Sequence, residues 1–274
     1  MASFMAADCR EARPWPRTGR DAFHSARREW LRAAAVLMAG ACGATSRADM
    51  GPARPAPSAP ELYSARLPGA FRWTYRLTRG ALSATGSLRW AMQGDRYELV
   101  LQGEAPVFGT IIVQRSSGLW GPHGLVPTQF SDRRWRRSER VARFDSAAGW
   151  VTFSDGSEPV RWVPGMQDRL SWLVQLAGIA QASRGRVEAG RTLTMQVVGA
   201  RGDTDRWSFR SEGPTTVEVE GGSVRAMKLA RLPREPGDTA VDVWLDPARQ
   251  HLPVQARMAD GQGEPLELSL RRTN

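Results

Sequence analysis

The feature that most constrains this chain is its only long helical pattern after residue 50, GMQDRLSWLVQLAGIAQA at residues 165–182. Apolar residues recur there at steps of three and four, which places them on one face of a helix. These residues are Met166, Leu170, Leu173, Ala177 and Ala180. Other apolar side chains leave only a narrow polar edge formed by Asp168, Ser171 and Gln175. A helix this apolar must be largely enclosed by the rest of the chain.

The rest of the chain after residue 62 alternates between apolar and polar residues in short runs. In residues 71–77, Phe71, Trp73 and Tyr75 face one side and polar residues face the other. About fourteen such runs, mostly about seven residues long and joined by tight turns, predict an antiparallel sheet that curls or closes. We therefore expect a mainly β protein: a single large curved antiparallel sheet or half-barrel wrapped around one long apolar helix at about 165–182. An outer-membrane barrel is a further alternative, which runs of this length disfavour.

The first 48 residues predict an N-terminal extension and an export signal, because a basic segment precedes a short apolar run, residues 33–41. Arg27 and Arg28 resemble a twin-arginine signal, so the general and twin-arginine export routes both stay open. Cys42 is a candidate lipidation site, with plain signal cleavage as the alternative. We expect an exported protein located in the periplasm, or anchored to a membrane through Cys42.

Residues 49–61 predict a Pro/Ala-rich linker, and residues 62–274 predict one β-rich domain. Both cysteines precede this domain, so no disulfide framework is expected within it. The chain has a formal net charge of +10, but Lys228 is the only lysine among its 38 basic residues. Such a bias is typical of GC-rich coding, and we expect no nucleic acid as a partner.

Several short motifs resemble the domain of unknown function 3108 family, whose members are exported β-rich proteins of Gram-negative bacteria. The motifs lie at residues 94–97, 124–127, 167–176, 243–246 and 252–254, and the resemblance covers roughly residues 68–272. It implies a β-rich exported protein without an established activity. The last two motifs are also similar to periplasmic lipoprotein carriers and receptors, which are half-barrels with helices over a cavity for acyl chains. This second resemblance implies a lipid-like ligand.

Two groups of polar residues are candidate binding sites. Asp168 and Arg169 either anchor a ligand headgroup at the barrel mouth or serve the fold, with Asp168 in the first helical turn and Arg169 paired to a strand carboxylate. The sequence favours the structural role, and Gln175 is a further candidate on the same polar edge. The second group is a basic hairpin, which either binds anionic lipid or is simply a solvent-exposed face of the sheet. It contains Arg133, Arg134, Trp135, Arg136 and Arg137.

The remaining motifs do not indicate catalysis. His123 and His251 lie in turn signals without cysteine partners, so we expect no metal and no cofactor. No nucleophile or phosphate-loop motif is present, although a dispersed carboxylate pair would leave no spacing signature. Aromatic residues on alternating strand faces predict core, or the lining of a pocket if the barrel is not filled. They are Phe71, Trp73, Tyr75, Trp90, Trp207, Phe209 and Trp244.

Three hypotheses follow for the function. The first is a non-enzymatic periplasmic binding or accessory protein with a lipid-like ligand in an apolar cavity. The second is a filled barrel that contacts an envelope protein or an anionic membrane surface through its arginine-rich hairpin. The third is a hydrolase with dispersed acidic residues.

Overall fold

The computed structural model describes residues 61–231, 233, 238–260 and 263–273. The predicted extension, the export signal with Cys42, and the linker apart from Glu61 lie outside the described residues. The strands expected from the sequence are present, and all of the described strands belong to one sheet. Its strands are β1 (Phe71–Arg79), β2 (Leu82–Gln93), β3 (Arg96–Ala105), β4 (Gly109–Gly121), β5 (Gly124–Arg134), β6 (Arg140–Asp145), β7 (Trp150–Phe153), β8 (Val160–Arg161), β9 (Gln167–Asp168), β10 (Thr192–Val198), β11 (Thr204–Val219), β12 (Gly222–Arg231), β13 (Thr239–Asp246), β14 (Leu252–Asp260) and β15 (Leu266–Thr273).

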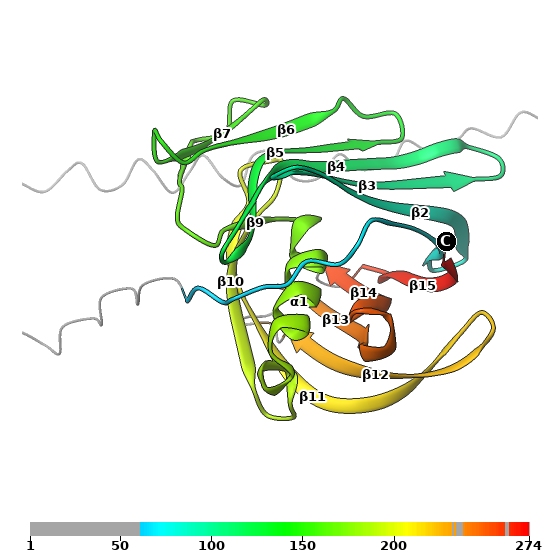
Figure 1. The fold of residues 1–274 in the computed structure, drawn as a ribbon. Helices are drawn as coiled ribbons and strands as arrows, with labels where there is room; N and C mark the ends of the chain where they lie inside the picture. Colours follow the sequence, from blue (N-terminus) through cyan, green and yellow to red (C-terminus); the bar gives the residue numbers. More distant parts are fainter. Residues whose placement is uncertain (1–60, 232, 234–237, 261–262, 274) are drawn as a thin grey trace, which may run out of the picture. The chain divides into compact units, whose positions relative to one another are not determined.

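The sheet is a meander whose first and last strands pair with each other. Its strand order is β8-β7-β6-β5-β4-β3-β2-β1-β15-β14-β13-β12-β11-β10-β9, so β8 and β9 are its edges and the sheet is curved but not closed. All pairs are antiparallel except β9 with β10, where Gln167 lies opposite Val197 in a parallel bridge. Figure 1 shows how the sheet curves around the helix α1.

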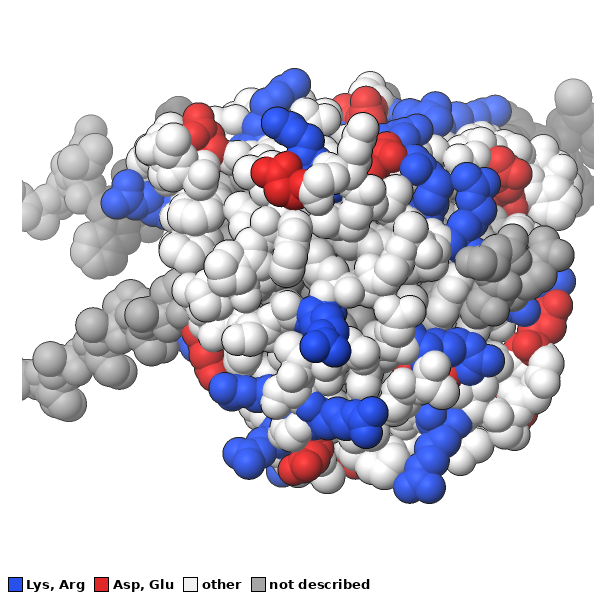
Figure 2. All heavy atoms as spheres, in the orientation of Figure 1, with Lys and Arg blue, Asp and Glu red and all other residues white. Residues whose placement is uncertain are grey.

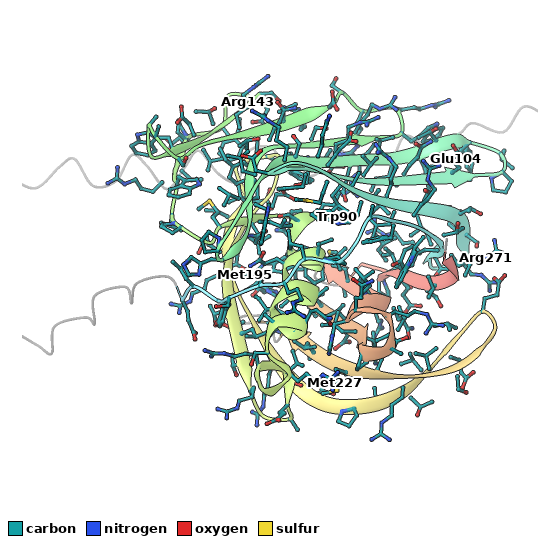
Figure 3. All side chains as sticks on the ribbon, viewed as in Figure 1. Trp90, Glu104, Arg143, Met195, Met227 and Arg271 are labelled. Atoms are coloured by element: carbon teal, nitrogen blue, oxygen red, sulfur yellow. The ribbon has the colours of Figure 1, made fainter. Side chains whose placement is uncertain are left out.

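The predicted alternation of side chains is confirmed in the strands. On β1, Phe71, Trp73, Tyr75 and Leu77 are buried while the residues between them are more exposed. Figure 3 shows the result for the whole sheet, with Trp90 inside the curve and Arg143 on its outer surface. Because one face of each strand is apolar, the curved sheet encloses a single core around α1.

The helix α1 (Ser171–Ala182) is shorter than predicted, because the predicted start at Gly165 is wrong by six residues. Residues 167–168 form β9 instead, and the Asp168 backbone N–H donates to Ser171 Oγ at 2.9 Å. Local bonds of this kind compete with helix and favour a helix start just after them. Ten of the twelve residues of α1 are buried, from Ser171 to Ala180. Two short 3-10 helices, η1 (Arg184–Val187) and η2 (Pro247–Arg249), complete the described elements.

Residues 61–70 form an irregular segment, the strap, which crosses α1 (Figure 1). The Arg66 backbone N–H donates to Gly178 O at 2.8 Å, where a Cβ on Gly178 would lie 3.3 Å from Ala65. Tyr63 is buried and its hydroxyl accepts the Thr194 N–H at 2.9 Å. These contacts show that the strap covers one side of the helix.

The space-filling view of this side shows Lys and Arg mainly around the margin of the face (Figure 2).

Successive turns of an antiparallel meander alternate between the two ends of the sheet. The turns after β1, β3, β5 and β10 share one end, which we call the open end. The turns after β2, β4 and β11 share the other, the strap end, where the Gly69 N–H donates to Gln250 Oε1 at 3.1 Å. Several strands are longer than the predicted runs of about seven residues: β4 has 13 residues and β11 has 16. Within the described residues, no helix is long and apolar enough to cross a membrane.

Candidate functional site

A buried hydrogen-bonded network surrounds Asp168. Its Oδ1 accepts the backbone N–H groups of Leu170 at 2.8 Å and Ser171 at 2.7 Å, which caps the start of α1. Its Oδ2 accepts Ser116 Oγ–H of β4 at 2.5 Å, and Ser116 Oγ lies 2.9 Å from the Tyr97 hydroxyl of β3. The sequence predicted Asp168 in the first helical turn, and this is wrong: Asp168 lies three residues before the first residue of α1. It thereby connects the helix to two central strands.

Two glutamines fasten the same segment to the β4–β5 turn. Gln175 Oε1 accepts the Leu125 N–H at 2.8 Å, and its Nε2 donates to His123 O at 2.8 Å. Gln167 Nε2 donates to Leu125 O at 3.0 Å. Gly124 has a φ of 91°, a conformation that favours glycine, and a Cβ there would displace the Gln175 amide, because it would lie 2.2 Å from Gln175 Oε1. We call Tyr97, Ser116, Gln167, Asp168, Ser171 and Gln175 the anchor network.

Burial sets the protonation of this network. It raises the pKa of Asp168 from 3.8 to about 6, against the opposing effect of the hydrogen bonds from Ser116, Ser171 and Leu170. Burial also raises the pKa of Tyr97 well above its ordinary value, and the nearby Asp168 charge adds to this. Asp168 and Gln175, both predicted as candidate binding residues, thus have their polar atoms engaged inside the fold.

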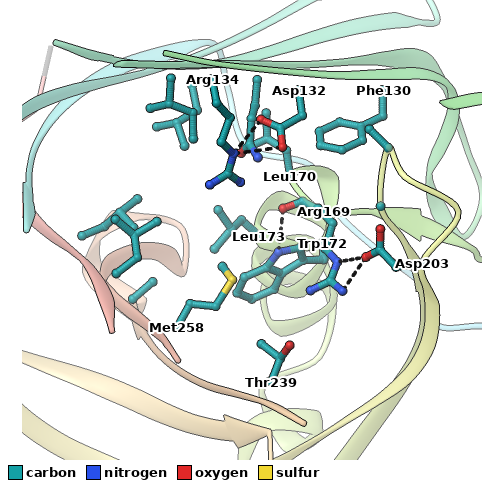
Figure 4. Close-up of a pocket in the computed structure, with 18 of the residues that line it drawn as sticks. Phe130, Asp132, Arg134, Arg169, Leu170, Trp172, Leu173, Asp203, Thr239 and Met258 are labelled. Carbon is teal, nitrogen blue, oxygen red and sulfur yellow. Dashed lines mark hydrogen bonds and ion pairs between the residues drawn. The ribbon is translucent and has the colours of Figure 1, made fainter. Parts of the chain in front are cut away.

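A cavity of about 730 Å³ lies at the open end, on the other side of the same segment (Figure 4). Leu170 and Leu173 line it, and they lie on a different face of α1 from Gly178, which the strap covers. Half of the residues that line it are apolar, and these come from β3, β4, β5, the start of α1, β14, β15 and the β10–β11 turn. These side chains are Leu101, Ile112, Phe130, Leu170, Trp172, Leu173, Ala200, Ala256, Met258, Leu266 and Leu268.

Arginines dominate the polar part of the lining. Five are present, against three carboxylates: Arg79, Arg134, Arg137, Arg169 and Arg201, with Asp132, Asp203 and Glu264. Arg134 Nε donates to Asp132 Oδ2 at 3.1 Å, and Arg169 Nη2 donates to Asp203 Oδ2 at 2.6 Å (Figure 4). The side chains of Arg137 and Arg201 make no ion pair or hydrogen bond within the described residues. The cavity mouth therefore carries uncompensated positive charge.

Arg169 is held in place at this cavity. Its guanidinium pairs with Asp203, just before β11, and lies 4.9 Å from the centroid of the Trp207 ring. The sequence predicted a strand carboxylate as the partner of Arg169, but Asp203 lies in the β10–β11 turn, and Arg169 is also part of the cavity lining. Asp168 and Arg169, neighbours in sequence, thus point to two different regions.

The arginine-rich hairpin lies beside the cavity. Arg134 ends β5 and lines the cavity, while Trp135, Arg136 and Arg137 form the β5–β6 turn at the open end. Arg133 on β5 is exposed. Among the predicted candidates, Arg134, Arg137 and Arg169 come together around the cavity, and Asp168 and Gln175 do not.

The other predicted candidates serve the core or the surface. Six of the seven aromatic residues on alternating faces are buried and Trp244 is half-buried, and none of them lines the cavity. His123 is exposed, and His251 is buried with Nδ1 2.9 Å from Gln181 Oε1. Burial lowers the pKa of His251. In the part of the chain that the structure describes, no group of three or more His, Cys, Asp or Glu residues is placed to hold a metal.

Apart from Arg169, the cavity-lining residues outside the hairpin were not predicted from the sequence as binding residues. Arg79 and Leu266 lie opposite each other in the β1–β15 pairing, and Met258 comes from β14. No local pattern links residues so far apart in the chain. The turn 199–203, with glycines on both sides of Arg201, is the one available signal, since glycines there indicate an exposed turn.

Comparisons with known proteins agree with this fold. A family model described as "Protein of unknown function (DUF3108)" matches residues 71–271. A crystal structure of a beta-barrel-like protein of domain of unknown function DUF1849 from Brucella abortus is similar, with a TM-score of 0.50 and 14% identity over 77% of this chain and 99% of that chain. A crystal structure of MucB matches 75% of this chain and 53% of its own at 13% identity, but its TM-score of 0.31 supports no conclusion. No curated protein sequence matches the chain.

Proposed function

This chain belongs to the DUF3108 family, and we propose that it is an exported, non-enzymatic binding protein that holds a lipid-like ligand in the open-end cavity. The ligand class is an acyl chain with an anionic head. The observation that carries the proposal is the cavity itself, about 730 Å³, with apolar side chains forming half of its lining and arginines at its mouth. Small-molecule sites are typically roughly 300–1,000 Å³, mostly apolar, with a few polar groups that fix orientation.

The apolar lining supports the acyl chain. Its side chains come from both halves of the meander and from α1, so the space lies between the helix and the sheet (Figure 4). Filling it with methylene groups gains roughly 0.8 kcal/mol for each group removed from water.

The charges at the mouth support the anionic head. Asp132 and Asp203 compensate Arg134 and Arg169, and the Arg79 guanidinium donates to Glu264 O at 3.2 Å. Arg137 and Arg201 are left for a carboxylate or phosphate of the ligand, which arginine binds through paired N–H donors.

Titration of the full chain with the fluorescent fatty acid cis-parinaric acid tests this function. We expect saturable binding to one site and displacement by palmitate, with weaker displacement by the uncharged hexadecanol. Met258→Trp fills the cavity and should abolish binding. Met227→Trp is the matched control, because Met227 is also partly buried against the core but lies outside the cavity lining. Equal binding by both variants would exclude this cavity as the site.

A further inference from the structure

Apolar side chains are exposed at the open end of the sheet. In the turn between β3 and β4, Val107 is 84% exposed and Phe108 is 49% exposed; in the β5–β6 turn Trp135 is 44% exposed. The Phe108 and Trp135 ring centroids lie 5.1 Å apart in an edge-to-face arrangement. The backbone N–H of Trp135 donates to Ile111 O at 2.8 Å. The two turns are thus joined in one projecting surface, which we call the tip: residues 106–108 and 133–136.

A fourth exposed apolar residue lies at the same end. Leu82, at the start of β2, is 67% exposed. In the β2–β3 register, Thr85 pairs with Glu104. Extending this register places Leu82 of β2 opposite Val107, just beyond the end of β3. Isolated apolar residues on a surface are ordinary, but a group at one end of a sheet marks an interaction site.

Basic side chains surround these apolar residues. The Arg136 guanidinium lies 4.4 Å from the centroid of the Trp135 ring, and its backbone has a φ of 54°, a left-handed conformation uncommon outside glycine. Arg133 and Arg136 are exposed and form no ion pair within the described residues. Aromatic and aliphatic side chains flanked by unpaired arginines match the interface of an anionic bilayer, which offers an apolar boundary beneath negative headgroups.

We propose that the tip is a docking surface for an anionic lipid membrane. Val107, Phe108 and Trp135 enter the headgroup boundary, and Arg133 and Arg136 bind lipid phosphates. The cavity mouth faces the same end, since Arg134 and Arg137 follow from the same hairpin into its lining. Docking by the tip therefore brings the cavity to the membrane surface. The proposal does not depend on which ligand the cavity holds.

Co-sedimentation of the full chain with vesicles tests the proposal. We expect binding to vesicles of phosphatidylcholine mixed with phosphatidylglycerol, and weaker binding to phosphatidylcholine alone. Phe108→Ser with Trp135→Ser, and separately Arg133→Glu with Arg136→Glu, should each weaken binding to the anionic vesicles by about tenfold or more. Val107→Glu is the variant with least risk to folding, because its side chain is almost wholly exposed, and it should weaken binding in the same direction.

The chain offers a matched control at the other end of the sheet. Trp150 is 41% exposed, starts β7, and lies 5.4 Å from the Arg161 guanidinium, a tryptophan–arginine pair like the one at the tip. Trp150→Ser with Arg161→Glu should leave vesicle binding unchanged. Equal loss in this control and in the tip variants, or no vesicle binding by the full chain, would overturn the proposal. Met258→Trp should bind vesicles normally, so failure of the cavity function and failure of docking give different results.

Discussion

The anchor network and the open-end cavity share one segment of chain but have opposite properties. Gln167, Asp168, Ser171 and Gln175 point to the network, where their hydrogen bonds to backbone and Ser116 are all internal. Arg169, Leu170, Trp172 and Leu173 line the cavity. On one side the polar groups are buried and, apart from Gln167 Oε1, hydrogen-bonded inside the fold, and on the other side apolar surface and arginines remain available. Residues 167–176 therefore combine side chains that hold the fold together with side chains that shape a binding site.

The largest effect should come from the centre of the network. Asp168→Ala, measured at pH 5, removes the acceptor for two backbone N–H groups and the hydrogen-bond partner of Ser116. Each buried donor left unpaired costs about 1–3 kcal/mol, so we expect a loss of about 4 kcal/mol in the free energy of unfolding. Urea denaturation measures it. Asp203→Ala, which breaks only the exposed pair with Arg169, should cost less than about 1 kcal/mol. Equal costs would remove the distinction between the two regions.

The pH dependence of stability should come from the same residue. Because the pKa of Asp168 is about 6 in the fold and 3.8 ordinarily, its contribution to stability is complete below pH 3.8 and is lost as pH rises through 6. The loss corresponds to about 3 kcal/mol. In Asp168→Asn the amide oxygen accepts both N–H groups and the NH₂ group donates to Ser116. This variant should lack that loss in urea denaturation between pH 4 and pH 7, and a profile parallel to the wild type would contradict the assignment.

A smaller effect is expected at the β4–β5 turn. Gln175→Ala removes the bonds to Leu125 N and His123 O and should lower the free energy of unfolding by about 2 kcal/mol. Its affinity for cis-parinaric acid should not change, since Gln175 does not line the cavity. Urea denaturation and fluorescence titration of the same preparation check both parts. A large loss of affinity with intact stability would move Gln175 into the binding site.

The smallest effect on stability belongs to the cavity mouth. Arg201→Glu should change the free energy of unfolding by less than about 0.5 kcal/mol, because the side chain is exposed and has no partner. Affinity for cis-parinaric acid should fall about tenfold, and less so at high salt. Arg210→Glu, an exposed arginine on β11 away from the cavity, is the control for net charge. Equal loss in both variants would show that only the overall charge matters.

The sequence predicted the fold better than the site. Alternation along residues 71–77 is enough to identify β1 and its buried face, and tight turns imply the antiparallel meander. The helix start was missed because Met166 and Leu170 continue the helical spacing although residues 167–168 pair with β10. Apolar spacing alone cannot distinguish a buried bridge from a helical turn.

The cavity depends on tertiary closure that no local pattern reveals. Its lining joins residues from both ends of the chain through the β1–β15 pairing. The sequence predicted one part of the tip, the arginine-rich run with Trp135, but not the other part, Val107 and Phe108. Val107 and Phe108 stand between Pro106 and Gly109, and apolar residues inside such a turn signal are a usable indication of an exposed surface.

Native mass spectrometry of the full chain, isolated without detergent from cells that produce it, tests the central claim most directly. The account predicts an added mass of lipid size that disappears on organic extraction, is absent from Met258→Trp and is present in Met227→Trp. A bare wild-type mass in a preparation with the far-UV spectrum of a folded β protein, or an added mass retained equally by both variants, would contradict the claim that the open-end cavity holds a lipid.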